Sequence, residues 1–337
     1  MKRHESLLVC VLGLALASVG LTGCRSRAAA PADLAPSVAV PTASPVAAAL
    51  GGTAAGWIDD LSALYLDPAG LAGRRFEGSV ATAVAAGAPY PALADQLDAL
   101  RRLVSAPDAS LTDARARVTT LGGLLMDASG LALLAVGEAD VRDGSGDARL
   151  LSAFSFGAGY SIGPRWLSAR WQAGTALRLL QAHEARPDQG RSWVGRGFAI
   201  DAAVRATWAE TLSVGLVLHD LAGSLTWRDQ DGAVAGARQW LLSGSRARVG
   251  IALVSPDRRT RLTGEAGLDG AWGIGLEQRV LGDRVAARVG KGRLAGLGPS
   301  DTMGVGLRLG PLALDAALVL PQGDEAPVLA AALRVAF

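Results

Sequence analysis

The amino-acid sequence predicts an all-β fold, an antiparallel transmembrane β-barrel of about 12 to 14 strands, and three observations lead to this prediction. Apolar side chains alternate with Gly, Ala and charged residues in one segment after another between Leu131 and Phe337. Short turn sequences such as Gly163-Pro164 and Asp269-Gly270 separate these segments. The last segment carries its apolar residues in phase with the final Phe337. Since residues i and i+2 share one face of a strand, this pattern favours a barrel with an apolar outside and a polar lumen.

Composition limits the classes of protein that the chain could belong to. Half of the 337 residues are hydrophobic, 19% are charged and the mean hydropathy is +0.28, which excludes a disordered chain. The net charge is +2, and without Lys2, Arg3 and Glu5 it is 31 minus 30, or +1, so no nucleic-acid partner is expected. With two cysteines near the N-terminus and three histidines, neither a metal site nor another cofactor is predicted.

The N-terminal residues have the pattern of a bacterial lipoprotein signal peptide. Lys2 and Arg3 precede an apolar run, and Leu21-Thr22-Gly23-Cys24 has the form of a lipobox. We therefore expect a signal peptide at residues 1–23 and lipidation of Cys24. The alternative is an ordinary cleavage site near residues 28–30, in which case Cys24 has no role. Residues 24–53 are rich in Ala and Pro and predict a tether, because repeated prolines prevent a continuous helix.

The barrel itself is expected over residues 75–337. One region interrupts the alternation, because apolar residues there recur at helical spacing, as in Leu93, Leu97, Leu100 and Val104. This spacing predicts a helical hairpin inserted at residues 88–121. The final strand places Leu333, Val335 and Phe337 on one apolar face, which resembles the C-terminal insertion signal of outer-membrane barrels.

A motif before the first strand resembles a known family. Residues 62–72 read SALYLDPAGLA, and the segment Asp67-Pro68-Ala69-Gly70 resembles the hatch motif of the FadL-like outer-membrane β-barrel superfamily, with Asp67 in place of the usual Asn. Residues 197–201 and 216–221, together with the insertion at 88–121, resemble the PorV and TraF-like (conjugal transfer TraF-type) branch. The resemblance implies a hatch-like segment at 54–74 inside a barrel of the bacterial outer membrane.

The resemblance also implies a function without catalysis. It is either the transport of a small apolar solute or the scaffolding of an envelope or secretion complex, and the partners would be outer-membrane lipid and an apolar ligand or an envelope protein. The competing hypothesis is an acyl-anchored periplasmic lipoprotein that binds a partner and does not span the membrane. Its apolar strand faces would have to pack against one another as a sandwich.

Three short patterns could indicate catalysis, but none fits its required context. Gly159 to Gly163 match the G-x-S-x-G pattern around Ser161, yet Pro164 and the alternation predict a hairpin and not a turn into a helix. His183-Glu184 and His219-Asp220 could each form an acid–base pair. Neighbours in a strand point to opposite faces, so we expect neither pair to act together.

Overall fold

The computed structural model describes residues 44–73, 75–86, 114–142, 145–162, 169–186, 191–229, 231–241, 246–294, 297–323 and 326–336. Two short helices and a 3-10 helix come first: α2 (Pro45–Ala49), α3 (Ala63–Leu66) and η3 (Pro68–Ala72). Fifteen described strands follow: β1 (Arg75–Ala86), β2 (Ala114–Asp127), β3 (Ser129–Arg142), β4 (Ser145–Ile162), β5 (Ala169–Arg186), β6 (Arg191–Trp208), β7 (Leu212–Asp229), β8 (Val234–Leu241), β9 (Ala247–Val254), β10 (Thr260–Gly267), β11 (Trp272–Val280), β12 (Val285–Leu294), β13 (Gly298–Leu309), β14 (Leu312–Pro321) and β15 (Val328–Ala336).

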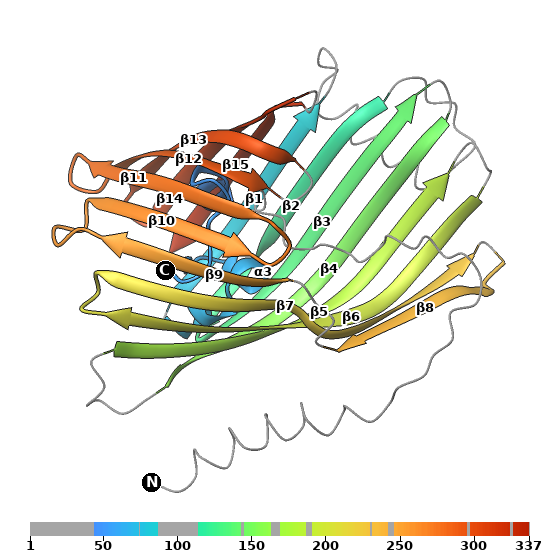
Figure 1. The fold of residues 1–337 in the computed structure, drawn as a ribbon, viewed down its shortest axis with the longest axis horizontal. Coiled ribbons are helices and arrows are strands. Elements are labelled where there is room, and N and C mark those ends of the chain that lie inside the picture. The colour runs from blue at the N-terminus through green and yellow to red at the C-terminus, as the bar shows by residue number, and fades with distance from the viewer. Residues whose placement is uncertain are drawn as a thin grey trace, which may run out of the picture.

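The strands form a closed antiparallel barrel (Figure 1). Apart from β8, which pairs with β7 and not with β9, each strand pairs with the next strand of the ring, and β15 pairs with β1 to close it. Strand β7 has two partners on one side, because its first half pairs with β9 and its second half pairs with β8. The ring therefore holds fourteen strands, with β8 as an extension next to β7. This architecture confirms the predicted fold class.

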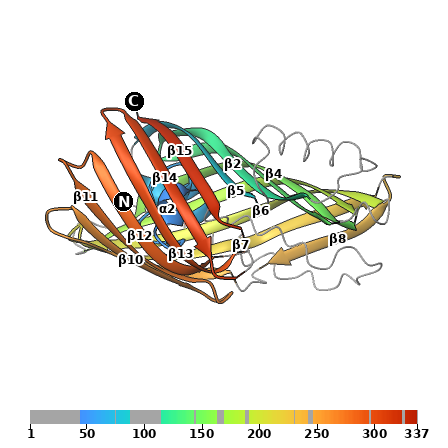
Figure 2. The ribbon, with the colours of Figure 1, turned by 90° about the horizontal axis from the view of Figure 1, so that it is seen from above.

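The wall of the barrel has two very different heights (Figures 1 and 2). We call the end where β1 begins and β15 ends the proximal end, and the opposite end the distal end. Strands β4 to β7 have 18 residues each, or about 60 Å at about 3.3 Å per residue, whereas β9 and β10 have 8, or about 26 Å. The long strands, the tall wall, extend past the short ones at the distal end.

The outer face shows which part of the tall wall suits lipid. On β5 the outward side chains from Trp171 to Leu179 are mostly apolar, and the next outward ones are Gln181 and His183. On β6, Phe198 is followed in the distal direction by Arg196. The apolar band is thus about nine residues high, close to the 9 to 11 that a tilted strand needs to cross a bilayer. The rest of the tall wall rises beyond this band.

Residues 44–73 form a plug inside the barrel, and α2 is enclosed by the strands in Figure 2. The plug corrects the predicted tether, because the chain is already buried from Ser44 and not only from residue 54. Glycines on the inner face of the wall permit this packing: a Cβ on Gly215 would lie 2.3 Å from the Gly56 nitrogen, and one on Gly250 would lie 2.1 Å from the Ala55 oxygen.

The predicted insertion at 88–121 is wrong over its last residues. Residues 114–121 belong to strand β2, paired with β1 and β3, so pairing in the sheet overrides the helical spacing of Ala114, Val118 and Leu121. Residues 88–113 lie outside the described part of the chain, as do Cys24 and Phe337. On β15, Leu329 and Leu333 face outward as expected. Among the described residues, no helix has the length and apolarity of a membrane-spanning helix.

Candidate functional site in the barrel lumen

The predicted hatch residue Asp67 holds the plug to the barrel wall. Its Oδ2 accepts hydrogen bonds from the Arg205 Nη2 on β6 at 2.6 Å and from the Gly56 nitrogen at 2.8 Å, and its Oδ1 accepts one from the Ala69 nitrogen at 3.2 Å. Arg205 Nη2 also donates to the Ile58 carbonyl at 2.5 Å. Asp67 is fully buried and Arg205 nearly so. One ion pair therefore connects three parts of the plug to the tall wall.

The rest of the predicted motif packs against the same wall. Pro68, Ala69 and Gly70 lie in η3, which contacts β4, β5 and β6. A Cβ on Gly174 of β5 would lie 1.9 Å from the Pro68 oxygen, and a Cβ on Gly70 would lie 2.1 Å from the Ile58 oxygen. The Asp-Pro-Ala-Gly segment therefore makes close backbone-to-backbone contacts in addition to the ion pair of Asp67.

A second buried cluster lies at a bulge in β7. The pairing of β6 with β7 shifts between Ile200 and Ala202, so that residues 219–221 of β7 lie opposite the single residue 201. Arg178 Nη2 on β5 donates to the carboxylates of Asp201 at 2.7 Å and Asp220 at 2.6 Å. The Asp220 backbone, at φ +52°, donates to Asp201 at 2.7 Å, and Arg246 also pairs with Asp220.

The bulge corrects the prediction that His219 and Asp220 point apart. Both reach the same cluster, since the His219 Nδ1 lies 3.9 Å from the Asp201 carboxylate that binds the Asp220 backbone. Regular alternation assumes one residue per pairing position, and the extra residues of a bulge break that rule. Alternation along β6 is consistent with the inward position of Asp201, but alternation along β7 does not place both His219 and Asp220 beside it.

Tyr65 fills the space between the plug and this side of the wall. Its hydroxyl donates to the Ala153 carbonyl of β4 at 3.3 Å, and the side chain is 1% exposed. Burial raises the pKa of Tyr65 to about 12. The ring therefore stays neutral over the physiological pH range.

The inner face of the tall wall is apolar along much of its height, including parts level with the polar outer residues. The Leu180 and Ala182 side chains of β5 lie on the inner face at the same height as the outward Gln181 and His183. They belong to a buried cluster that also contains Leu134, Val136, Leu151, Leu225 and Trp227, with Trp193 packed against it. Where it rises beyond the lipid-facing band, the tall wall is thus polar on its outer face and mainly apolar on its inner face, where Glu184 is a buried exception.

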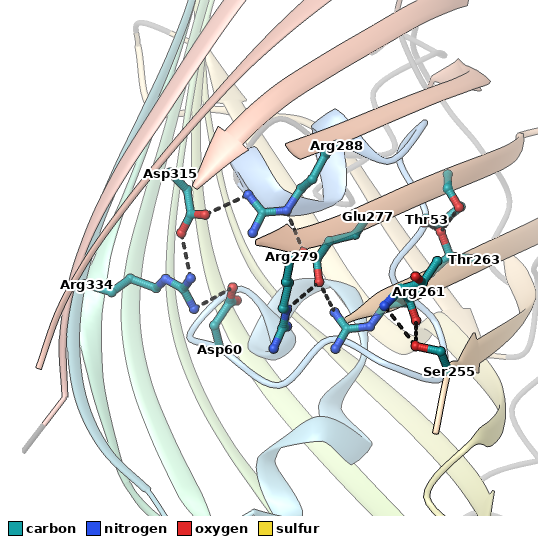
Figure 3. Close-up of polar contacts among 12 residues, drawn as sticks. Thr53, Asp60, Ser255, Arg261, Thr263, Glu277, Arg279, Arg288, Asp315 and Arg334 are labelled. Carbon is teal, nitrogen blue, oxygen red and sulfur yellow. Dashed lines mark hydrogen bonds and ion pairs between the residues drawn. The ribbon is translucent and has the colours of Figure 1, made fainter. Parts of the chain in front are cut away.

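The proximal end of the lumen has the opposite character (Figure 3). A pocket of about 230 Å³ lies between residues 57–60 of the plug and strands β10 to β15. Six arginines line it: Arg261, Arg279, Arg284, Arg288, Arg308 and Arg334. Five acidic residues accompany them: Asp59, Asp60, Glu277, Asp283 and Asp315. We call this the arginine pocket.

Ion pairs connect most of these charges. Glu277 accepts hydrogen bonds from Arg288 at 2.7 Å and Arg279 at 2.9 Å, and its Oε1 lies 3.6 Å from Arg261. Asp315 accepts from Arg288 at 2.7 Å and from Arg334 at 2.6 Å.

Two further contacts join this network to the plug. The Arg334 Nη1 lies 3.7 Å from the Asp60 carboxylate, and the Arg261 guanidinium lies 5.0 Å from the centre of the Trp57 ring.

The other patterns considered in the sequence do not form a site. Ser161 lies within strand β4, as the hairpin interpretation expected. Glu184 is buried on the inner face of β5, whereas the half-exposed His183 faces outward and its Nε2 lies 3.0 Å from the Gln181 side-chain nitrogen. In the described part of the chain no cluster of His, Cys, Asp and Glu has the make-up of a metal site.

Comparison with known proteins shows the fold of this barrel. It resembles the toluene transporter TbuX of Ralstonia pickettii, with a TM-score of 0.55 and 13% identity over 87% of this chain and 98% of that one. It also resembles the toluene transporter TodX of P. putida (TM-score 0.50, 11% identity, 86% and 97% covered) and a FadL homologue of Pseudomonas aeruginosa (0.50, 12%, 86% and 97%). No family model and no curated protein matches the sequence.

These findings decide part of what the sequence predicted. The barrel resembles these solved structures in fold, and its closed ring with an apolar outer band overturns the alternative of a sandwich, in which those faces would be covered. The PorV and TraF-like branch stays a prediction.

Proposed function

We propose that this protein is a non-enzymatic barrel of the bacterial outer membrane that lets a small apolar solute pass through its plugged lumen. The observation that supports this proposal most is the apolar inner face of the tall wall where its outer face is already polar. At that height the wall lies beyond the lipid-facing band, so we infer that the apolar inner face contacts a solute in the lumen. The structural neighbours named toluene transporters make a monoaromatic hydrocarbon a suitable first probe.

The passage of such a solute requires the plug to move. Near η3 the plug is held by the buried ion pair of Asp67 with Arg205 and by glycine contacts that leave no room beside the backbone. Its earlier part is held by hydrogen bonds to the wall, from the Ala54 and Ala55 nitrogens to Glu265 and from the Gly51 nitrogen to Thr302. Around η3 apolar burial and close packing are non-directional, whereas the ion pair fixes the position of this segment. We infer that solute passage shifts the segment around Asp67.

The test is the uptake of radiolabelled toluene by cells that carry or lack the gene. Deletion is expected to slow uptake, and the intact gene to restore it. Replacement of Leu180 by Gln puts a polar amide on the apolar inner face and is expected to lower uptake several-fold. The matched control is Leu268→Gln, the same change on an exposed turn at the distal end. Unchanged uptake in the deletion strain across a panel of apolar solutes would refute the proposal.

Membrane insertion is tested separately by heat-modifiability. An extract in mild detergent should migrate faster on a gel before boiling than after it, because a closed barrel resists SDS. The scaffold hypothesis predicts instead that a defined envelope protein co-purifies at constant stoichiometry and that uptake is normal in the deletion strain.

A further inference from the structure

The arginine pocket carries an inference that does not depend on the passage of an apolar solute. We propose that it is a binding site for a small hydrophilic dicarboxylate, held between the plug and the short strands at the proximal end. Three features of the pocket support this site: its excess of cationic groups, its volume and its position beside the plug.

The pocket has more cationic donors than its own carboxylates use. Six arginines face five acidic residues, which leaves an excess charge of +1. Inside, the Nε atoms of Arg261 and Arg334 are buried without a hydrogen-bond partner in the described residues. At the rim, the exposed guanidinium groups of Arg284 and Arg308 have no ion pair or hydrogen bond within the part of the chain that the structure describes, and Asp283 is the acidic residue beside them.

The rim arginines are neighbours at one end of the β12–β13 pair. Arg284 lies in the turn between β11 and β12, Arg308 lies near the end of β13, and the Arg308 nitrogen donates to the Arg284 carbonyl at 2.7 Å. A guanidinium group binds a carboxylate through two parallel hydrogen bonds, so the two rim groups suit one end of an elongated anion, whose second carboxylate would reach the arginines deeper in the pocket. Free arginines at an open surface would be ordinary, but here they border a pocket whose interior is also rich in donors.

The size of the pocket selects among oxyanions. The volume of about 230 Å³ is larger than a single phosphate or acetate needs and has room for a four-carbon dicarboxylate. Eleven of the eighteen lining residues are charged and six are apolar, among them Val46, Ile58 and Leu307, so a large apolar ligand is not favoured.

The position of the pocket links the anion to the plug. Trp57 to Asp60 form the plug side, and the Asp60 carboxylate lies 3.7 Å from Arg334. A bound dicarboxylate would contact the barrel and the plug together.

The experiment is calorimetric titration of succinate into the full barrel purified in mild detergent. We expect saturable binding of one succinate per chain that weakens as ionic strength rises. The neutral isostere succinamide should not bind, and butyrate, which has one carboxylate, should bind at least tenfold more weakly. Inorganic phosphate tests the size argument and should also bind more weakly.

Variants locate the site. The double change Arg284→Gln and Arg308→Gln should weaken succinate binding at least tenfold, because charge-assisted hydrogen bonds are lost. The matched control Arg258→Gln removes an exposed arginine at the same end that lies outside the pocket, and should change affinity less than twofold. Asp283→Asn removes the acidic residue at the rim and should tighten binding two- to fivefold, a gain that misfolding cannot imitate.

No succinate binding to the intact barrel, equal binding of succinamide, or tighter binding of phosphate than of succinate would each overturn the proposal. Equal affinity in the Arg284→Gln, Arg308→Gln variant and the Arg258→Gln control would also overturn it. Toluene uptake is measured separately, so failure here does not coincide with failure of the proposed transport.

Discussion

Asp67 offers the sharpest test of how the plug is held. The change Asp67→Asn restores the residue that the FadL-like hatch motif usually carries and keeps one acceptor oxygen, but it removes the charge opposite Arg205. Both partners are buried, with side-chain exposures of 0% and 7%, and Arg205 keeps the Ile58 carbonyl as an acceptor. Loss of one partner from a buried pair costs about 3 to 5 kcal/mol, and the acceptors that remain reduce this to about 1.5 to 3 kcal/mol.

The free energy lost from the Asp67–Arg205 pair can be measured as a change in the rate of cysteine labelling inside the plug. Ala63 is fully buried in α3, so Ala63→Cys, in a background with Cys10 and Cys24 replaced by Ser, reports plug opening through labelling by a maleimide. When reclosing is faster than labelling, the rate follows the population of the open state. Asp67→Asn should therefore increase the labelling rate by about 10- to 150-fold.

The control is Glu210→Gln, the same loss of a carboxylate from a pair with Arg258 that is about two-thirds exposed. Surface pairs of this kind contribute little, so the labelling rate should not change measurably. If Asp67→Asn labels at the rate of the unchanged protein, the ion pair does not hold the plug and the reasoning is wrong.

Three further predictions use the same purified barrel. Gly174→Ala should displace η3 and speed labelling at residue 63, because its Cβ would lie 1.9 Å from the Pro68 oxygen, whereas Gly264→Ala should not, since its nearest neighbour is 3.5 Å away. Tyr65 should stay protonated until about pH 12, measured as the difference in ultraviolet absorbance between the unchanged protein and Tyr65→Phe. Because folding raises the pKa of Tyr65, the stability that this residue contributes is complete below about pH 10 and is lost as the pH rises to 12. Titration of Tyr65 near pH 10 would contradict its burial. Arg288→Met leaves Asp315 with Arg334 as its remaining described partner and should lower barrel stability by about 3 kcal/mol in urea unfolding, while Arg258→Met should have no measurable effect.

The strands were predictable because a barrel wall repeats one simple rule. In β9, Val249, Ile251 and Leu253 face outward while Arg248 and Gly250 face the lumen, as the alternation of residues 246–254 required. The residues of the hatch motif, Asp67 and its neighbours, lie buried in the plug, and the motif gave no partner for the carboxylate.

The parts that the sequence did not predict depend on contacts between distant residues. Arg205 is 138 positions from Asp67, and alternation shows only that its side chain faces inward. The segment that begins with α2 consists mostly of small residues and Pro, a composition that predicts a tether. Its burial depends on the glycines of β12 and β13 that face it, and the local sequence does not show them. The bulge at residues 219–221 left no sign in a period-two pattern, because all three residue types occur in regular strands.

The unequal height of the barrel has a mechanical consequence. The strands that project beyond the lipid-facing band are the same strands that carry Gly174 and Arg205 against the plug, and β5 and β6 remain paired along their whole length. A force on the distal rim is therefore transmitted along hydrogen-bonded strands to the proximal contacts, as along a lever arm of about 30 Å, or about nine residues at 3.3 Å each. The β7 bulge is the point along that arm where the ladder is broken and the sheet bends most easily.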